Sequence, residues 1–220
     1  MFKSLSLLYT KIKYGFFSPE YYELYTHLHS NRFMEAFAVK PATGLRFEDH
    51  FRQLCEFRNH QKNHVQGHFL LSRVDLGASF RQCMEELGKP LLFNAAYEKG
   101  VPMMVAGYKH SANPIVYKTL YFFSGNQFLM NEIHIYNSTD QQHMSFAREL
   151  LKRRSISVTL SDADLQLFTD NNKMTIAVIK EAFKVKIIFF HEEDQHLQKI
   201  INQLCNASRD EPIVITANKK

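Results

Sequence analysis

The sequence holds little glycine, proline or cysteine and no tryptophan, with 8 Gly, 6 Pro and 3 Cys among its 220 residues. So few glycines and prolines exclude collagen-like and low-complexity chains. The three widely spaced cysteines (Cys55, Cys83 and Cys205) argue against a disulfide framework and fit a reducing compartment. We therefore expect a cytoplasmic protein without structural disulfides.

Long apolar runs are also missing. The longest, such as 187–190, span only a few residues, whereas a membrane-crossing helix needs about 20. The apolar stretch 5–9 contains Ser6 and is followed by Lys11 and Lys13. It is therefore shorter than the apolar region of a secretory signal, which takes roughly 7–15 residues. We expect neither membrane insertion nor a secretory signal.

The usual catalytic motifs are absent as well. The sequence contains no GxxxxGK[ST], GxGxxG, HExxH, CxxC or GxSxG pattern. This removes the common signatures of P-loop ATPases, Rossmann dehydrogenases and zincins. We therefore predict no cofactor, and we favour a non-enzymatic role while leaving catalysis open.

The apolar residues, 45% of the chain, suffice for a hydrophobic core, and their spacing changes near residue 110. Residues 1–110 show mainly helical periodicity, with a helix start at 18–20 and apolar stripes at 47–55 and 80–87. Glycines and a proline punctuate a short apolar stretch at 101–106. This part of the chain predicts a mainly helical region.

Residues 111–220 indicate strands and helices in alternation. Expected strands are 115–123, 128–136, 156–160, 185–190 and 212–216, and expected helices are 139–154 and 197–204, with a short helical turn after Ser161. The segment 174–183 fits a helix or a strand. This order predicts an α+β fold: a helical N-terminal part, then a β-hairpin and an α/β C-terminal part with a mixed sheet. The two parts can also form one compact unit.

A net charge of +5 favours polyanionic partners. The densest basic cluster lies at the end of the helix 139–154. Its members are Arg148, Lys152, Arg153 and Arg154. Such cations can contact phosphates, although a solvated helix end also carries them. Lys118 lies on the expected hairpin among aromatic residues, which either stack bases or pack in the core. We predict these five residues as nucleic-acid-binding.

Two groups of residues are candidate metal ligands. His60, His64 and His68 are spaced i, i+4, i+8, so a continuous helix would present all three on one side; the alternative is exposed histidines near a loop. Asp162 and Asp164 follow an expected strand, where two carboxylates can hold Mg²⁺. The alternative for this pair is helix capping from Ser161.

From Val116 onward the hydrophobic pattern is similar to a known family. The matching pieces are Tyr117-Lys118, the strand 133–135, the helix 147–151, the strand 156–160, a helix start at 164–168 and the strand 185–188. They resemble the large polyvalent protein-associated accessory domains that follow relaxases in conjugative plasmids. The resemblance implies a helix at 174–183 and a mobile-element protein near DNA-transfer machinery. It implies no catalytic residues.

Three functions follow as hypotheses. The first is a non-enzymatic protein that binds nucleic acid or a nucleoprotein partner through basic surface. The second is a protein–protein adaptor of a secretion or conjugation machine. The third is a metal-dependent phosphoryl-transfer enzyme using Asp162, Asp164 and Glu192. The oligomeric state is left open.

Overall fold

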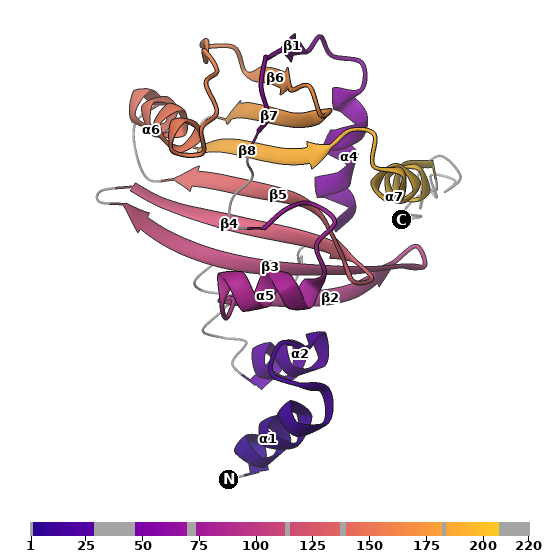
Figure 1. Ribbon diagram of the computed structural model, residues 1–220. Helices are drawn as coiled ribbons and strands as arrows, with labels where there is room; N and C mark the ends of the chain where they lie inside the picture. The colour runs from indigo at the N-terminus through magenta and orange to yellow at the C-terminus, as the bar shows by residue number, and fades with distance from the viewer. Residues whose placement is uncertain are drawn as a thin grey trace, which may run out of the picture.

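The computed structural model describes residues 2–28, 47–69, 74–112, 115–136, 140–181 and 184–206 (Figure 1). Its helices are α1 (Phe2–Tyr14), α2 (Pro19–Leu28), α4 (Phe47–Phe57), α5 (Phe80–Leu87), α6 (Asp140–Arg153) and α7 (Gln195–Asn206). Its strands are β1 (Asn63–His64), β2 (Leu92–Glu98), β3 (Val101–Ala112), β4 (Ile115–Ser124), β5 (Gln127–Tyr136), β6 (Leu165–Thr169), β7 (Met174–Glu181) and β8 (Lys184–His191). The expected α+β class with a mixed sheet is confirmed.

All eight described strands form one sheet in the order β1-β6-β7-β8-β5-β4-β3-β2. Short β1 pairs with β6 in parallel, and every other neighbouring pair is antiparallel. Strands β2 to β5 form one meander and β6 to β8 another. Helix α6 connects the two meanders, so that β8 lies beside β5 at the centre of the sheet.

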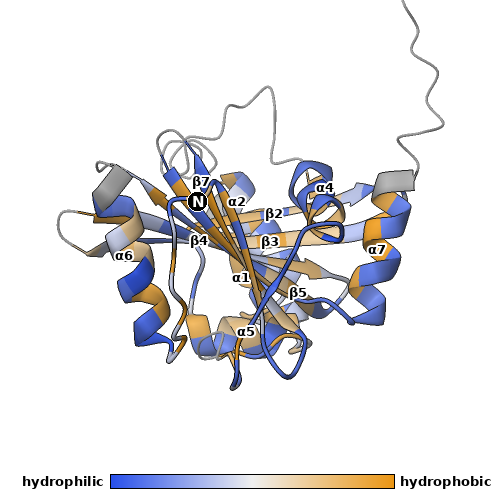
Figure 2. Cartoon of the chain, turned by 90° about the horizontal axis from the view of Figure 1, so that it is seen from above, coloured by the Kyte–Doolittle hydropathy of each residue, from blue (hydrophilic) through white to orange (hydrophobic). Residues whose placement is uncertain are grey.

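Helices cover both faces of this sheet (Figures 1 and 2). Because side chains alternate along a strand, Ile133 and Ile187 point to the face covered by α6, with α5 and α2 over the same face nearer β2. Leu120 and Ile188 point to the opposite face, which α4 and α7 cover. We call these the α6 face and the α4 face. The fold therefore has three layers, with the sheet between two layers of helices.

Helix α4 is fixed across its face by packing and by a cap. Phe47, Phe51 and Leu54 recur at helical spacing and are buried against the sheet. At its first turn, the carboxylate of Glu98 on β2 accepts hydrogen bonds from the backbone N–H groups of Phe47 (2.9 Å) and Glu48 (2.7 Å). These bonds satisfy two amides that the helix leaves without a partner. The position of α4 is therefore tied to the end of β2.

Several expected elements are confirmed, and several are not. The hairpin of β4 and β5, helix α6, strand β8 and helix α7 all form where the spacing places them. The short apolar stretch 101–106 is instead part of the long strand β3, and β2 is a second strand that the mainly helical interpretation missed. Pairing of β3 with β4 carries the sheet across the boundary expected near residue 110. The expected strand 212–216 lies outside the described residues.

Several predictions in the second half were wrong. Residues 156–160 form no strand, and no helix starts at 164–168, because residues 165–168 belong to strand β6. No helical turn forms after Ser161 for the same reason, since the following residues pair with β7. The ambiguous segment 174–183 contains strand β7, so the helix implied by the resemblance is not present at Met174–Glu181. Membership of that family stays a prediction.

The expectation of no disulfide was also wrong. Cys55 on α4 is disulfide-bonded, and its partner lies outside the side chains that the structure describes. The wide spacing of the cysteines in the sequence was a poor guide to their distance in space. The fold brings segments that are far apart in sequence together, as the packing of α4 against α7 shows. Cys83 is buried and free. The compartment inferred from cysteine usage therefore stays a prediction. None of the described helices is both long and apolar enough to cross a membrane.

Candidate functional site

A row of basic side chains crosses four neighbouring strands on the α4 face. Lys109 on β3 is the partner of Lys118 on β4, Lys118 that of His134 on β5, and His134 that of Lys186 on β8. We call these four residues the lysine row. Directly opposite residues have Cβ atoms about 4.5–5.5 Å apart, and like charges placed there destabilise a sheet. Within the row, Lys109 and Lys118 are directly opposite lysines, so the sheet brings these two positive charges together at a cost in stability.

The lysine row runs from the interior to the surface. Lys186 and His134 are buried, Lys118 is half-buried and Lys109 is exposed. At the buried end, the Lys186 amine donates a hydrogen bond to the side-chain oxygen of Gln53 on α4. At the outer end, Lys109 lies past the last residue pair of β2 and β3, Leu92 with Gly107. The row thus begins under α4 and reaches solvent on β3.

One buried carboxylate lies beside the row. Glu132 is fully buried, and its Oε2 accepts hydrogen bonds from His50 Nδ1 of α4 (2.9 Å) and from His134 Nε2 (2.7 Å). Burial alone would raise the pKa of Glu132. The charge of His50, the hydrogen bonds from both imidazoles and the charge of Lys186 outweigh burial and hold that pKa well below its ordinary value. Glu132 therefore stays ionised and partly balances the row.

The histidine of the row is held neutral. Burial lowers the pKa of His134, although its hydrogen bond to Glu132 opposes this shift. Burial also raises the pKa of Tyr136 to about 12, and the Tyr136 hydroxyl lies 3.0 Å from His134 Nδ1. A neutral imidazole that donates from Nε2 to Glu132 accepts at Nδ1. The hydroxyl of Tyr136 therefore donates to Nδ1, which fixes the ring orientation.

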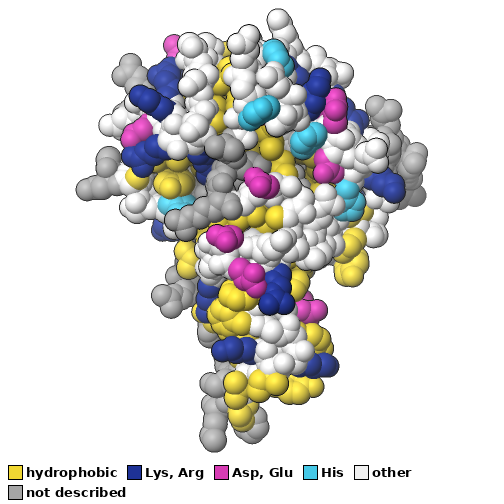
Figure 3. All heavy atoms as spheres, viewed as in Figure 1, with side chains coloured by type: hydrophobic (Ala, Val, Ile, Leu, Met, Phe, Trp, Pro, Cys, Tyr) yellow, Lys and Arg dark blue, Asp and Glu magenta, His cyan; other side chains and the backbone are white. Residues whose placement is uncertain are grey.

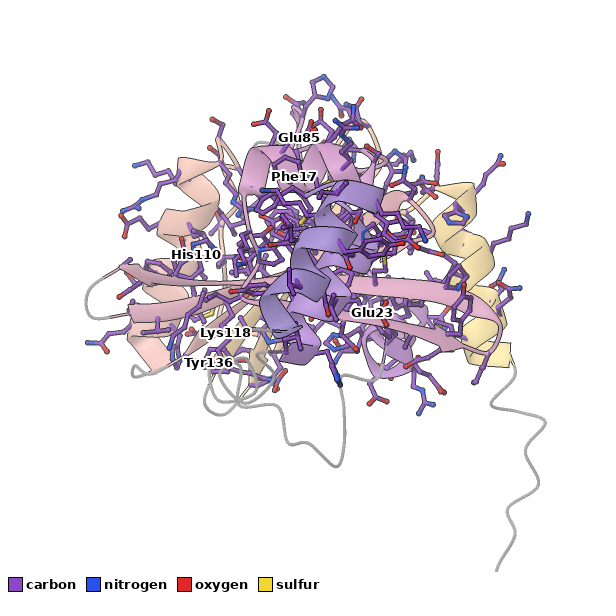
Figure 4. All side chains as sticks on the ribbon, turned by 90° about the horizontal axis from the view of Figure 1, so that it is seen from below. Phe17, Glu23, Glu85, His110, Lys118 and Tyr136 are labelled. Carbon is purple, nitrogen blue, oxygen red and sulfur yellow. The ribbon has the colours of Figure 1, made fainter. Side chains whose placement is uncertain are left out.

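Tyr136 also places an aromatic ring beside the outer part of the row. The Lys118 amine lies 4.9 Å from the centre of the Tyr136 ring, and Figure 4 shows the two side chains next to one another at one end of the sheet. Burial and, secondarily, the charge of Lys109 lower the pKa of Lys118. In the outer part of the row, two lysines that repel each other thus lie beside an aromatic ring.

The five residues predicted to bind nucleic acid do not form one surface. Lys118 belongs to the α4 face, whereas α6 covers the other face. Arg148 donates a hydrogen bond to the Leu160 carbonyl oxygen (2.9 Å), and Arg153 pairs with Glu149 (2.6 Å). The remaining two members differ in exposure. Lys152 is exposed, whereas Arg154 is half-buried and its guanidinium lies 5.1 Å from the centre of the Phe189 ring. Burial lowers the pKa of Arg154. Binding by this helix end stays a prediction.

The three candidate metal histidines do not share a helix. Helix α4 ends at Phe57, and His60 follows in a turn, with Nδ1 2.9 Å from the Glu56 carbonyl oxygen. His64 lies in β1 and its Nε2 is 3.1 Å from the Asn171 side-chain oxygen. His68 is exposed beyond β1. The helix that would present all three on one side is not formed, because pairing of β1 with β6 extends the chain there. The three histidines are exposed, as the alternative of exposed histidines near a loop expects.

The candidate acids do not form a metal site in the described part of the chain. Asp162 and Asp164 are exposed in the irregular segment before β6, and Glu192 pairs with Lys62. Within the described part of the chain, no group of three His, Cys, Asp or Glu side chains is arranged to hold a metal ion. The geometry therefore favours the lysine row as the candidate site.

Most of the lysine row was missed from the sequence, although one signal was available. Glu132, His134 and Tyr136 alternate with the apolar Ile133 and Ile135. In a strand, such alternation puts a polar stripe on one face. The partners of that stripe on β3 and β8 could not be found without the pairing of the strands.

Comparisons of this chain with protein-family models, with curated proteins and with solved structures find no significant match.

Proposed function

We propose that the protein binds single-stranded nucleic acid along the outer part of the lysine row, as a non-enzymatic accessory protein. The observation that carries this proposal is the alignment of Lys109 and Lys118 with His134 and Lys186 across four strands. Lys109 and Lys118 place like charges directly opposite one another, which costs stability. Phosphate groups of a bound strand offset that repulsion, so binding is favoured by relief of an interaction that destabilises the free protein.

The aromatic ring beside the row favours a single strand over a duplex. Neighbouring strands lie about 4.7–4.9 Å apart, so the amines of Lys109 and Lys118 are spaced to contact adjacent parts of one phosphate backbone. Bases of a single strand are free to stack on an aromatic side chain, and Tyr136 provides its ring beside Lys118. Phosphate contacts give affinity without sequence specificity, so the proposal includes both DNA and RNA.

The setting of this activity is a separate part of the proposal. The resemblance to accessory domains that follow relaxases supports a role near the DNA-transfer machinery of a mobile element. This setting belongs to the proposal and does not affect the test of the lysine row.

The test is a fluorescence-anisotropy titration with labelled single-stranded DNA, single-stranded RNA and duplex DNA at two salt concentrations. We expect binding to single strands that weakens steeply with salt. The double variant Lys109→Gln with Lys118→Gln loses two phosphate contacts, so it lowers affinity about tenfold and the salt slope by about 1.4.

The matched control is Lys152→Gln with Arg153→Gln, which removes two exposed cations from α6 on the other face. We expect this pair to leave affinity unchanged. Loss of binding in the control alone would move the interface to α6. No binding to any of the three probes at low salt would reject the nucleic-acid function. A pull-down for a protein partner, with and without nuclease, would then test the adaptor alternative.

A further inference from the structure

Exposed apolar side chains are concentrated on α1. Five of the seven large hydrophobic residues that are exposed in the described chain lie on this helix. They are Leu5 (55% exposed), Leu8 (52%), Tyr9 (63%), Ile12 (76%) and Tyr14 (47%). The other two, Leu91 and Tyr97, lie on the body of the protein. So many exposed apolar residues on one short helix indicate a surface made for contact.

Four of these side chains form one stripe. Leu5, Leu8, Tyr9 and Ile12 are spaced i, i+3, i+4 and i+7, so they share one side of α1. Leu7 lies on another side and packs against the core under α2 and α5. Figure 1 shows α1 beyond α2, at the end of the molecule farthest from β1. The helix is thus attached by one side and presents its apolar stripe outward.

The charge of α1 is of one sign. Its 13 residues contain three lysines and no acid. With 3.6 residues per turn, Lys11 and Lys13 fall on opposite sides of the apolar stripe. The Lys13 amine lies 4.7 Å from the Tyr14 ring and 5.8 Å from the Tyr9 ring. Figure 3 shows yellow apolar and dark blue basic side chains together on the narrow lower part of the molecule.

We propose that α1 docks the protein on an anionic lipid surface, with the stripe of Leu5, Leu8, Tyr9 and Ile12 in the headgroup region. Apolar residues flanked by lysines are the pattern of helices that lie in a membrane interface. Lysines on both sides of the stripe complement negative headgroups, and a tyrosine suits the boundary between apolar and polar layers. A helix of 13 residues lies on the bilayer rather than across it.

The test is co-sedimentation of the full chain with vesicles of phosphatidylcholine alone or with about one-third phosphatidylglycerol. We expect binding to the anionic vesicles that decreases with salt, and little binding to the neutral ones. The variant Leu8→Glu with Ile12→Glu places charge in the stripe and lowers binding about tenfold or more. The variant Lys11→Gln with Lys13→Gln retains the stripe and loses the preference for anionic vesicles.

The matched control is Leu91→Glu with Tyr97→Glu, which changes the two exposed apolar residues outside α1. We expect it to bind vesicles like the unmodified chain. Circular dichroism and thermal unfolding confirm that each variant is folded. Equal binding by the stripe variant, or binding to both kinds of vesicle alike, would overturn the proposal. So would light scattering that shows a dimer which the stripe variant dissociates, because a second copy would then cover α1. The nucleic-acid titration uses no lipid, so a negative result in one test does not decide the other proposal.

Discussion

Two groups of cations lie on opposite faces of the sheet, and the fold uses their charge differently. At the end of α6, Arg148 bonds a backbone carbonyl and Arg153 pairs with an acid one turn away. On the α4 face, Lys109 and Lys118 are directly opposite each other. The first arrangement satisfies its charges within the protein. The second places two like charges directly opposite each other.

Basic residues that are adjacent in the sequence are not the ones that the fold groups together. Residues 148–154 form the densest basic group in the sequence, yet the fold separates their side chains between packing, an ion pair and solvent. The members of the lysine row come from four strands, and His134 and Lys186 are far apart in the chain. In this fold, strand pairing groups cations that are far apart in sequence, and proximity in sequence does not.

The largest effect is expected at the carboxylate beside the row. Glu132→Gln leaves the charge of Lys186 buried without its balance, so we expect a loss of about 3 kcal/mol in unfolding free energy. Urea denaturation near neutral pH measures it. The control Glu149→Gln removes an exposed i, i+4 pair on α6 and costs less than about 0.5 kcal/mol. Equal losses would contradict the account, because the two faces would then be alike.

A pH dependence of intermediate size is expected from His134. Its pKa in the folded protein lies below the ordinary value of 6.5, so the unfolded chain takes up the proton first as pH falls. Unfolding free energy therefore decreases as pH falls below about 6.5. The low pKa of Glu132 adds a further loss only at more acidic pH, below its ordinary value of 4.5.

Urea denaturation at a series of pH values measures this dependence. In His134→Gln the decrease between about pH 7 and about pH 5 becomes smaller, because the titrating group is gone. The exposed His60, changed to Gln, is the matched control for removing an imidazole from the surface. A His134 variant with the unmodified slope would show that this imidazole is not held neutral by burial.

The smallest effect separates stability from binding. Lys109→Glu replaces repulsion of Lys118 by attraction, so the free protein gains about 0.5 kcal/mol and loses affinity for single strands. The equivalent change on α6, Arg153→Glu, breaks the pair with Glu149 and costs about 0.3–0.5 kcal/mol. Thermal unfolding and anisotropy measure both quantities. A Lys109 variant that loses stability would remove the argument that the row is electrostatically strained.

The sequence predicted helices that have one apolar and one polar side, and a hairpin marked by its turn residues. The amphipathic helices α6 and α7 and the Ser124-Gly125-Asn126 turn between β4 and β5 are visible in the sequence. Strand β3 was missed because it is buried on both sides over most of its length, and a strand buried on both faces shows no alternation. Strand β7 stayed ambiguous since its central residues are all buried.

Of the residues in the candidate site, the sequence analysis named only one. Lys118 was chosen for its aromatic neighbours, and the structure places it in the lysine row. His134 and Lys186 become partners only through the pairing of β5 with β8, two strands separated in sequence by α6, β6 and β7. A short-range pattern carries no information about such a contact.

The most direct test of the lysine row is lysine acetylation followed by mass spectrometry, with and without a single-stranded oligonucleotide. Lys109 and Lys118 lie on the α4 face, and the exposed Lys152 on α6 is an internal control in the same sample. The account predicts that the oligonucleotide protects Lys109 and Lys118 and leaves Lys152 as reactive as before. Protection of Lys152 without protection of Lys109 and Lys118 would contradict it.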